Sequence, residues 1–186
     1  MKKIFYTLLL FSTIAISHAQ VVPVEKIVDY DLAGKGIPDG VYFKDVNNLF
    51  DKFIGTWKGS MNNKNYTFII TKEVHNKYNV TTERLMMRHL ITDLNGAIIS
   101  DNRSDSRIQI IGDCFNKNPI FYDFIYAGEN SRCGLRGQVS IRNINPTTLK
   151  LILDPNTEWF AYDQYCPGGK RAEQILPTQY ITLTKQ

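Results

Sequence analysis

The chain has 186 residues, of which 43% are hydrophobic and 22% are charged, and its 22 Lys and Arg against 18 Asp and Glu give a formal net charge of +4. This composition, with 22 aromatic residues and only 12 Gly and 7 Pro, excludes disordered, collagen-like, coiled-coil and repeat proteins. So small a charge argues against nucleic acid as a partner. At this length we expect one globular domain whose core needs no metal or other cofactor.

The first nineteen residues have the pattern of a secretory signal peptide. Lys2 and Lys3 precede an apolar stretch over residues 4–16, and Ser17-His18-Ala19 offers small residues for cleavage before Gln20. Thirteen apolar residues fall short of the roughly 20 that cross a bilayer, so no membrane span is predicted. The sequence predicts an exported protein, periplasmic or extracellular, with a mature part of 167 residues and a net charge of about +2.

The mature chain begins with an N-terminal arm over residues 20–45, where turn residues around 33–40 separate short apolar stretches. This arm is either irregular or an irregular pair of strands. A single domain follows over residues 46–186. At its start, Val46, Leu49, Phe50 and Phe53 stand at spacings of three, four and seven. This one-sided pattern predicts a short helix over residues 46–53.

After Gly55 the pattern is that of β-strands: short runs rich in β-branched and aromatic residues, separated by turn residues. The expected strands cover residues 57–61, 66–74, 78–85, 86–92, 107–111, 120–127, 135–143, 149–153, 158–165 and 180–184. Short connections predict an antiparallel up-and-down meander. Eight to ten strands without helical crossovers form a sandwich or a closed barrel, and closure removes exposed edges. The fold class is therefore all-β, with a barrel of 8–10 strands preceded by a short helix.

The segment 49–59 carries the motif Gly55-Thr56-Trp57 at the start of the first expected barrel strand. It resembles the opening motif of the calycin superfamily, the lipocalins and fatty-acid-binding proteins. The resemblance implies that Gly55 and Trp57 form the base of a lipocalin-like barrel, as structural residues. It also implies a cationic side chain over the Trp ring, for which Lys170-Arg171 is the nearest candidate. The tight turn expected at 62–65 departs from the helical lid of fatty-acid-binding proteins.

Aromatic residues on the expected strands are sufficient to line a cavity for one small apolar ligand, and they would equally serve as ordinary core. The candidate lining residues are Tyr66, Phe68, Tyr122, Phe124, Tyr126, Phe160 and Tyr162. The main hypothesis is a secreted binding protein for a small hydrophobic ligand. The alternative is a surface, adhesion or inhibitor module that acts through its loops, over 100–106, 116–119 and 166–177, on a filled barrel. The sequence leaves the oligomeric state open.

No catalytic motif is present in the sequence. His75 and His89 are the only histidines of the mature chain, and neither has another His or Cys nearby, so no metal site is predicted. The segment 101–105 alternates oxygen ligands as a calcium loop does, but it lacks the central Gly and the bidentate Glu. Asp154, Glu158 and Asp163 are explained as charges at strand ends, and no Gly-x-Ser-x-Gly elbow occurs. The sequence therefore gives no reason to expect an enzyme.

Three cysteines, Cys114, Cys133 and Cys166, lie in the exported part, where disulfides are favoured. An odd number suggests one disulfide and one thiol. Counting the expected strands as they alternate in direction places Cys114 and Cys166 at one end of the barrel and Cys133 at the other. The predicted disulfide therefore joins Cys114 to Cys166.

Overall fold

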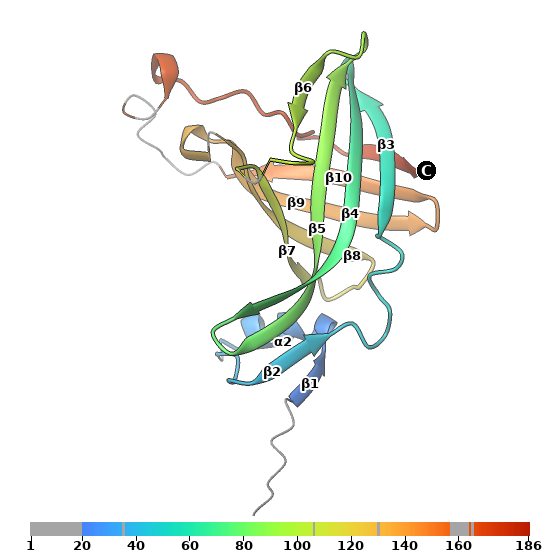
Figure 1. Ribbon diagram of the computed structural model, residues 1–186, viewed down its shortest axis with the longest axis vertical. Helices are drawn as coiled ribbons and strands as arrows, with labels where there is room; N and C mark the ends of the chain where they lie inside the picture. Colours follow the sequence, from blue (N-terminus) through green and yellow to red (C-terminus); the bar gives the residue numbers. More distant parts are fainter. Residues whose placement is uncertain (1–19, 35, 106, 130, 157–163, 165) are drawn as a thin grey trace, which may run out of the picture.

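The computed structural model describes residues 20–34, 36–105, 107–129, 131–156, 164 and 166–186. Eight antiparallel strands follow one another around a closed barrel, and the barrel closes where the last strand pairs with the first (Figure 1). Between the third and fourth strands in chain order, Met86 pairs with Ile111. The eight are β3 (Gly55–Met61), β4 (Lys64–Lys77), β5 (Val80–Asp93), β7 (Gln109–Phe115), β8 (Phe121–Ala127), β9 (Arg136–Asn145), β10 (Thr148–Pro155) and β11 (Ile181–Lys185). The predicted all-β, up-and-down barrel is confirmed.

Alternating side chains give the wall one buried and one exposed face, as the period of two requires. On β4 the inward residues are Tyr66, Phe68 and Ile70, and each is buried. The inward residues of all eight strands form one continuous apolar core. We call the end where β3 begins the base of the barrel, and the end where β3 turns into β4 the distal end.

Two-residue turns set the register of the first two hairpins. The β3–β4 turn is Asn62-Asn63, with φ of 51° and 59°. The β4–β5 turn is Tyr78-Asn79, with φ of 50° and 59°, so β4 continues through the residues 75–77 that the sequence suggested as a turn. Two consecutive left-handed residues are the requirement of a type I′ turn, whose twist matches that of the strands.

The β4–β5 hairpin is longer than the barrel and carries the N-terminal arm. The sequence pattern divided β5 into two strands, over 78–85 and 86–92, whereas the structure forms one strand of 14 residues. Below the barrel in Figure 1, β2 (Val41–Lys44) pairs in parallel with the first part of β5, and β1 (Gln20–Pro23) pairs in parallel with β2. The chain between them forms η1 (Val24–Lys26) and α2 (Ile27–Leu32).

Glu83 fastens the arm to the hairpin. Its carboxylate accepts hydrogen bonds from the Tyr42 hydroxyl at 2.7 Å and from the Asp45 backbone N–H at 3.0 Å, and Lys72 Nζ lies 3.7 Å away. Burial alone raises the pKa of Glu83, but these partners together with Lys44 outweigh it and hold the pKa below its ordinary value. The buried charge is thus compensated on several sides.

A short helix precedes the barrel, but it is α2 and not the predicted segment 46–53, which forms consecutive turns. The Asp45 carboxylate accepts hydrogen bonds from the backbone N–H groups of Leu49 at 2.7 Å and Phe50 at 3.1 Å. In addition, Asn48 has a φ of 54°, which interrupts a right-handed helix. The apolar spacing is nevertheless used, because Phe50 and Phe53 are fully buried.

The strand β6 (Ile98–Asp101) is an addition to the barrel wall that pairs with β5 alone. Two 3-10 turns, η2 (Ser131–Cys133) and η3 (Pro167–Gly169), lie in the distal connections. The strand expected over 158–165 falls almost wholly outside the described residues. In the described part of the chain, no helix has the length and apolar character that a membrane-spanning helix needs.

Candidate functional site

Trp57 and Gly55 lie at the base of the barrel. The Trp57 indole is fully buried, and its Nε1–H donates a hydrogen bond of 2.7 Å to the backbone oxygen of Phe53. Lys185 Nζ lies 5.3 Å from the centre of the Trp57 ring. The same side chain passes so close to Gly55 that a Cβ there would stand 2.8 Å from Lys185 Cε. The cation at this position is therefore Lys185, because β11 pairs Lys185 directly with Trp57. The expectation that Lys170 or Arg171 would fill this position is wrong.

An aromatic cluster fills the interior near the base of the barrel. The Tyr122 ring contacts Phe50 at 5.4 Å, Phe115 at 5.0 Å and Phe124 at 5.1 Å between ring centres. The Tyr122 hydroxyl accepts a hydrogen bond of 3.3 Å from the Leu85 backbone N–H, and burial raises the pKa of Tyr122. Of the candidate lining residues, Tyr122 and Phe124 therefore belong to a region that other side chains occupy.

Tyr66 and Phe68 lie side by side on β4, with ring centres 6.1 Å apart and planes 10° from parallel. Phe68 is fully buried, whereas Tyr66 reaches a pocket of about 360 Å³ at the distal end. This pocket lies between the β3–β4 turn and the chain that leads into β11; its other lining residues are Asn62, Lys64, Glu173, Gln174, Leu176, Pro177 and Thr178. Tyr66 is thus a candidate with access to the distal end.

Tyr126 is the candidate on β8 nearest the distal end. Its side chain is buried, and within the described part of the chain its hydroxyl has no hydrogen-bond partner. A Cβ at Gly128 would stand 2.6 Å from this hydroxyl, so a side chain at that position would crowd it. Burial raises the pKa of Tyr126 to about 12. Tyr126 also borders a second distal pocket, of about 600 Å³, at the ends of β8, β9 and β10.

His89, which sequence reasoning set aside, occupies an inward position on β5. It lies on the same inward face of the strand as Leu85, Met87 and Ile91, and it is fully buried. Its Nε2 lies 2.8 Å from Ser100 Oγ, and its Nδ1 has no hydrogen-bond partner among the described residues. Burial lowers the pKa of His89 to about 4, although Asp101 acts in the opposite direction. The imidazole is therefore neutral at pH 7.

The backbone of His89 is hydrogen-bonded to Asn102, the residue that directly follows β6. Asn102 Oδ1 accepts the His89 N–H at 2.5 Å, and the Asn102 N–H donates to the His89 carbonyl at 3.1 Å. Asn102 Nδ2 donates to the Ile108 carbonyl at 3.2 Å. The sequence signal for this site was a single His in a run whose alternate residues are apolar.

The disulfide joins Cys133 to Cys166, with Cα atoms 5.4 Å apart, and the predicted Cys114–Cys166 bond is wrong. The prediction counted a strand over 158–165 between Cys133 and Cys166. In the structure, β9 leads away from the distal end and β10 returns to it, so both cysteines lie there. Cys114 lies on β7 beside Phe115, in the aromatic cluster near the base, and takes no part in the disulfide.

The chain after Cys166 is fixed to the loop that contains Cys133. The Ala172 N–H donates to the Cys133 carbonyl at 2.9 Å, and Gln174 Nε2 donates to the Gly134 carbonyl at 2.8 Å. The Arg171 side chain packs over Gly134 and donates to the Asn156 carbonyl at 3.1 Å. These contacts and the disulfide make one covering layer, which we call the distal cover.

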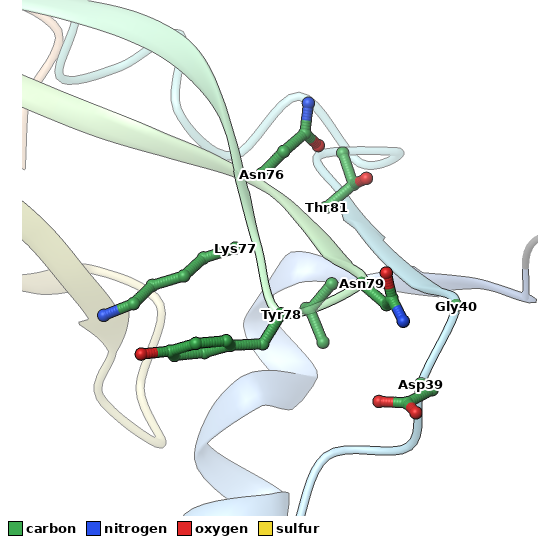
Figure 2. Close-up of a pocket in the computed structure, with 8 residues that line it drawn as sticks. Asp39, Gly40, Asn76, Lys77, Tyr78, Asn79 and Thr81 are labelled. Carbon is green, nitrogen blue, oxygen red and sulfur yellow. The ribbon is translucent and has the colours of Figure 1, made fainter.

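Another pocket, of about 770 Å³, lies at the tip of the β4–β5 hairpin, beyond the base of the barrel. Figure 2 shows Lys77 and Tyr78 extending side by side, and Lys77 Nζ is 4.9 Å from the Tyr78 ring centre. Asp39 and Gly40 form the facing side of the pocket. Tyr78 is 83% exposed, so this is an open surface and is separate from the barrel interior.

The remaining positions that the sequence singled out form no reactive site where the structure describes them. The segment 101–105 uses its carboxylates internally, because Asp101 pairs with Arg103 at 2.7 Å and Asp105 pairs with Arg107 at 2.8 Å. Within the described ranges, no three His, Cys, Asp or Glu side chains gather as metal ligands. The candidates Phe160 and Tyr162, and also Glu158 and Asp163, lie outside the described residues.

Comparison of the chain with family models, with curated proteins and with solved structures finds no match.

Proposed function

We propose that this protein is an exported, lipocalin-like binding protein that holds a small, largely apolar molecule in the distal half of its barrel. The observation that carries the proposal is the pair of buried polar atoms, His89 Nδ1 and Tyr126 Oη, which have no partner among the described residues of an otherwise apolar interior. Buried polar groups are almost always hydrogen-bonded, and each one that is not costs about 1 to 3 kcal/mol. A ligand that supplies the partners explains why these groups are retained.

The neighbouring side chains favour an apolar ligand body. Tyr66, Phe68, Ile91 and Ile110 are buried inward residues on strands near His89 and Tyr126. A ligand that buries 300 Å² of apolar surface among them gains about 7 kcal/mol at about 25 cal/mol per Å². The loss of translational and rotational freedom costs at least about 4 kcal/mol, so this apolar burial alone leaves an affinity no tighter than millimolar, and tighter binding needs a larger apolar contact or the polar contacts as well.

Two further features support the lipocalin-like and exported parts of the proposal. The strands follow one another in sequence order around the barrel, with Trp57 at the base and Lys185 over its ring. The Cys133–Cys166 disulfide is of the kind that persists in oxidising compartments, which agrees with the export signal expected in residues 1–19.

Native mass spectrometry of the exported protein, compared with denatured samples, tests the proposal directly. We expect a co-purified apolar molecule that is lost on denaturation, or, after delipidation, saturable binding of the neutral fluorophore Nile red. Absence of both results contradicts the proposal and leaves the alternative of a filled barrel that acts through its loops.

A paired substitution locates the binding site. Ile91→Phe adds bulk to a buried inward position, whereas Ile125→Phe makes the same change at an outward position that is 58% exposed. We expect Ile91→Phe to fold and to weaken Nile red binding at least tenfold, and Ile125→Phe to bind normally. If the distal half is already filled, Ile91→Phe instead lowers stability by about 1 to 3 kcal/mol through overpacking and binds as the wild type does.

A further inference from the structure

We infer that the ligand carries an uncharged hydroxyl or amide group that hydrogen-bonds His89 Nδ1 inside the barrel. This inference rests on the proposed function and adds the chemical class of the ligand. It starts from the geometry of His89, which is fully buried on an inward position and already uses Nε2 with Ser100. The remaining ring nitrogen is the group that a ligand would meet.

The tautomer of His89 decides whether Nδ1 donates or accepts, because the Ser100 hydroxyl can play either role toward Nε2. A hydroxyl or a primary amide can both donate and accept. Such a group therefore pairs with Nδ1 in either tautomer, whereas an ether or a ketone pairs with only one.

Among the residues that the structure describes, the buried interior offers no cation for an acidic ligand. The buried polar or charged residues of the described chain are Asp45, Glu83, His89 and Asn102, with no Lys or Arg among them. Asp45 and Glu83 bind the arm and the turns before β3, away from the distal half. His89 is neutral at pH 7 because burial depresses its pKa. A carboxylate placed there would lose its hydration without a counter-ion, which costs several kcal/mol.

Tyr126 provides a second uncharged group on the same side of the barrel, because β7 alone separates its strand from β5. Its hydroxyl stays protonated at neutral pH and can donate to a ligand oxygen. The competing arrangement is an acidic head group at the mouth of the barrel, where Arg171 lies in the distal cover with a buried Nε that has no partner in the described chain. The first arrangement predicts tighter binding of an alcohol than of an acid, and the second predicts the reverse.

A matched set of ligands separates these arrangements. Dodecanol, dodecanoate and dodecane are compared by displacement of Nile red at pH 8, in the wild type, His89→Leu, Arg171→Gln and the control His75→Gln. We expect dodecanol to bind at least tenfold more tightly than dodecanoate. His89→Leu should remove that advantage while dodecane binds as before, and Arg171→Gln and His75→Gln should change nothing.

Dodecanoate binding as tightly as dodecanol, and weakening in Arg171→Gln, overturns the inference while the proposed function stands. If Nile red does not bind and native mass spectrometry finds no co-purified apolar molecule, the proposed function fails and the inference fails with it. If Nile red binds but none of the three molecules displaces it, the inference is overturned while the proposed function stands. If His89→Leu does not fold, the wild type still gives an answer through the ring-nitrogen NMR shifts of its histidines. On addition of dodecanol, His89 Nδ1 should shift by several ppm and His75 should not, and an unchanged His89 overturns the inference.

Discussion

Two regions of the barrel interior treat their buried polar groups in opposite ways. At the base, the Trp57 indole N–H and the Tyr122 hydroxyl both have hydrogen-bond partners, and closely packed rings surround Tyr122. In the second region, His89 Nδ1, on β5 in register with Phe68, and Tyr126 Oη, near the distal end of β8, are equally buried and have no partners in the described chain. Burial alone therefore does not distinguish the core from the proposed binding site in this barrel, whereas the hydrogen bonding of the buried polar atoms does.

The difference also divides the predicted cavity-lining residues. Tyr122 and Phe124 belong to the packed aromatic cluster, whereas Tyr66 and Tyr126 border pockets at the distal end. If this division is right, changes at the base should alter stability without altering binding selectively. Changes at the distal end should alter binding or pH dependence and cost less stability.

The largest effect is expected at the base. Trp57→Ala removes a fully buried indole, and we expect a loss of about 3 to 5 kcal/mol in the free energy of unfolding. Urea denaturation followed by circular dichroism measures it, with Tyr78→Ala as an exposed aromatic control. If Trp57→Ala loses Nile red binding while its stability remains intact, the base is not a purely structural region.

The second largest effect is expected from removing the disulfide of the distal cover. Replacing Cys133 and Cys166 with Ser opens a loop with a sequence separation of 33 residues, and we expect a loss of about 3 to 4 kcal/mol. Thermal unfolding measures it, with Cys114→Ser as the control. Peptide mapping without reduction should find Cys133 joined to Cys166, and a peptide that joins Cys114 to Cys166 would restore the pairing first predicted.

His89 should make stability depend on pH. Its pKa is about 4 in the folded protein and near 6.5 when unfolded, so the unfolded chain binds the extra proton between these values. Stability is therefore complete above pH 6.5, falls as the pH is lowered to about 4, and loses about 3 kcal/mol over that interval. Urea titrations at pH 7 and pH 4.5 measure this. His89→Gln should remove most of the dependence, and an unchanged slope in that variant would assign it to other groups.

The smallest effect on stability is expected for substitutions of two tyrosines on β8. Tyr122→Phe leaves the Leu85 N–H without the hydroxyl and should cost about 1 kcal/mol. Tyr126→Phe removes a hydroxyl that has no partner in the described chain, so it should be neutral or stabilising by up to about 1 kcal/mol. Equal losses in the two variants, measured by thermal unfolding, would mean that the Tyr126 hydroxyl is satisfied and that the two ends do not differ.

The sequence predicted the barrel because strands with one buried face have apolar residues at every second position, and this pattern is visible in segments such as 66–70 and 139–142. It indicated β1 and β2 only as an irregular strand pair, one alternative for the N-terminal arm, and it missed β6, because a run of four residues carries little periodicity. The predicted helix at 46–53 failed because apolar spacing does not reveal the hydrogen bonds of the Asp45 carboxylate. The pairing of His89 with Ser100 depends on the register between β5 and β6, which no local pattern encodes.

The long β4–β5 hairpin also has a consequence for the order in which the chain folds. Its two strands of 14 residues are joined by a two-residue turn, so their contacts close short loops and cost little chain entropy. By contrast, the pairing of Lys58 with Thr184 joins the two ends of the barrel sequence. We therefore expect the hairpin to protect its amides early in refolding and the β3–β11 contact to form last, which sets the slowest step of barrel closure.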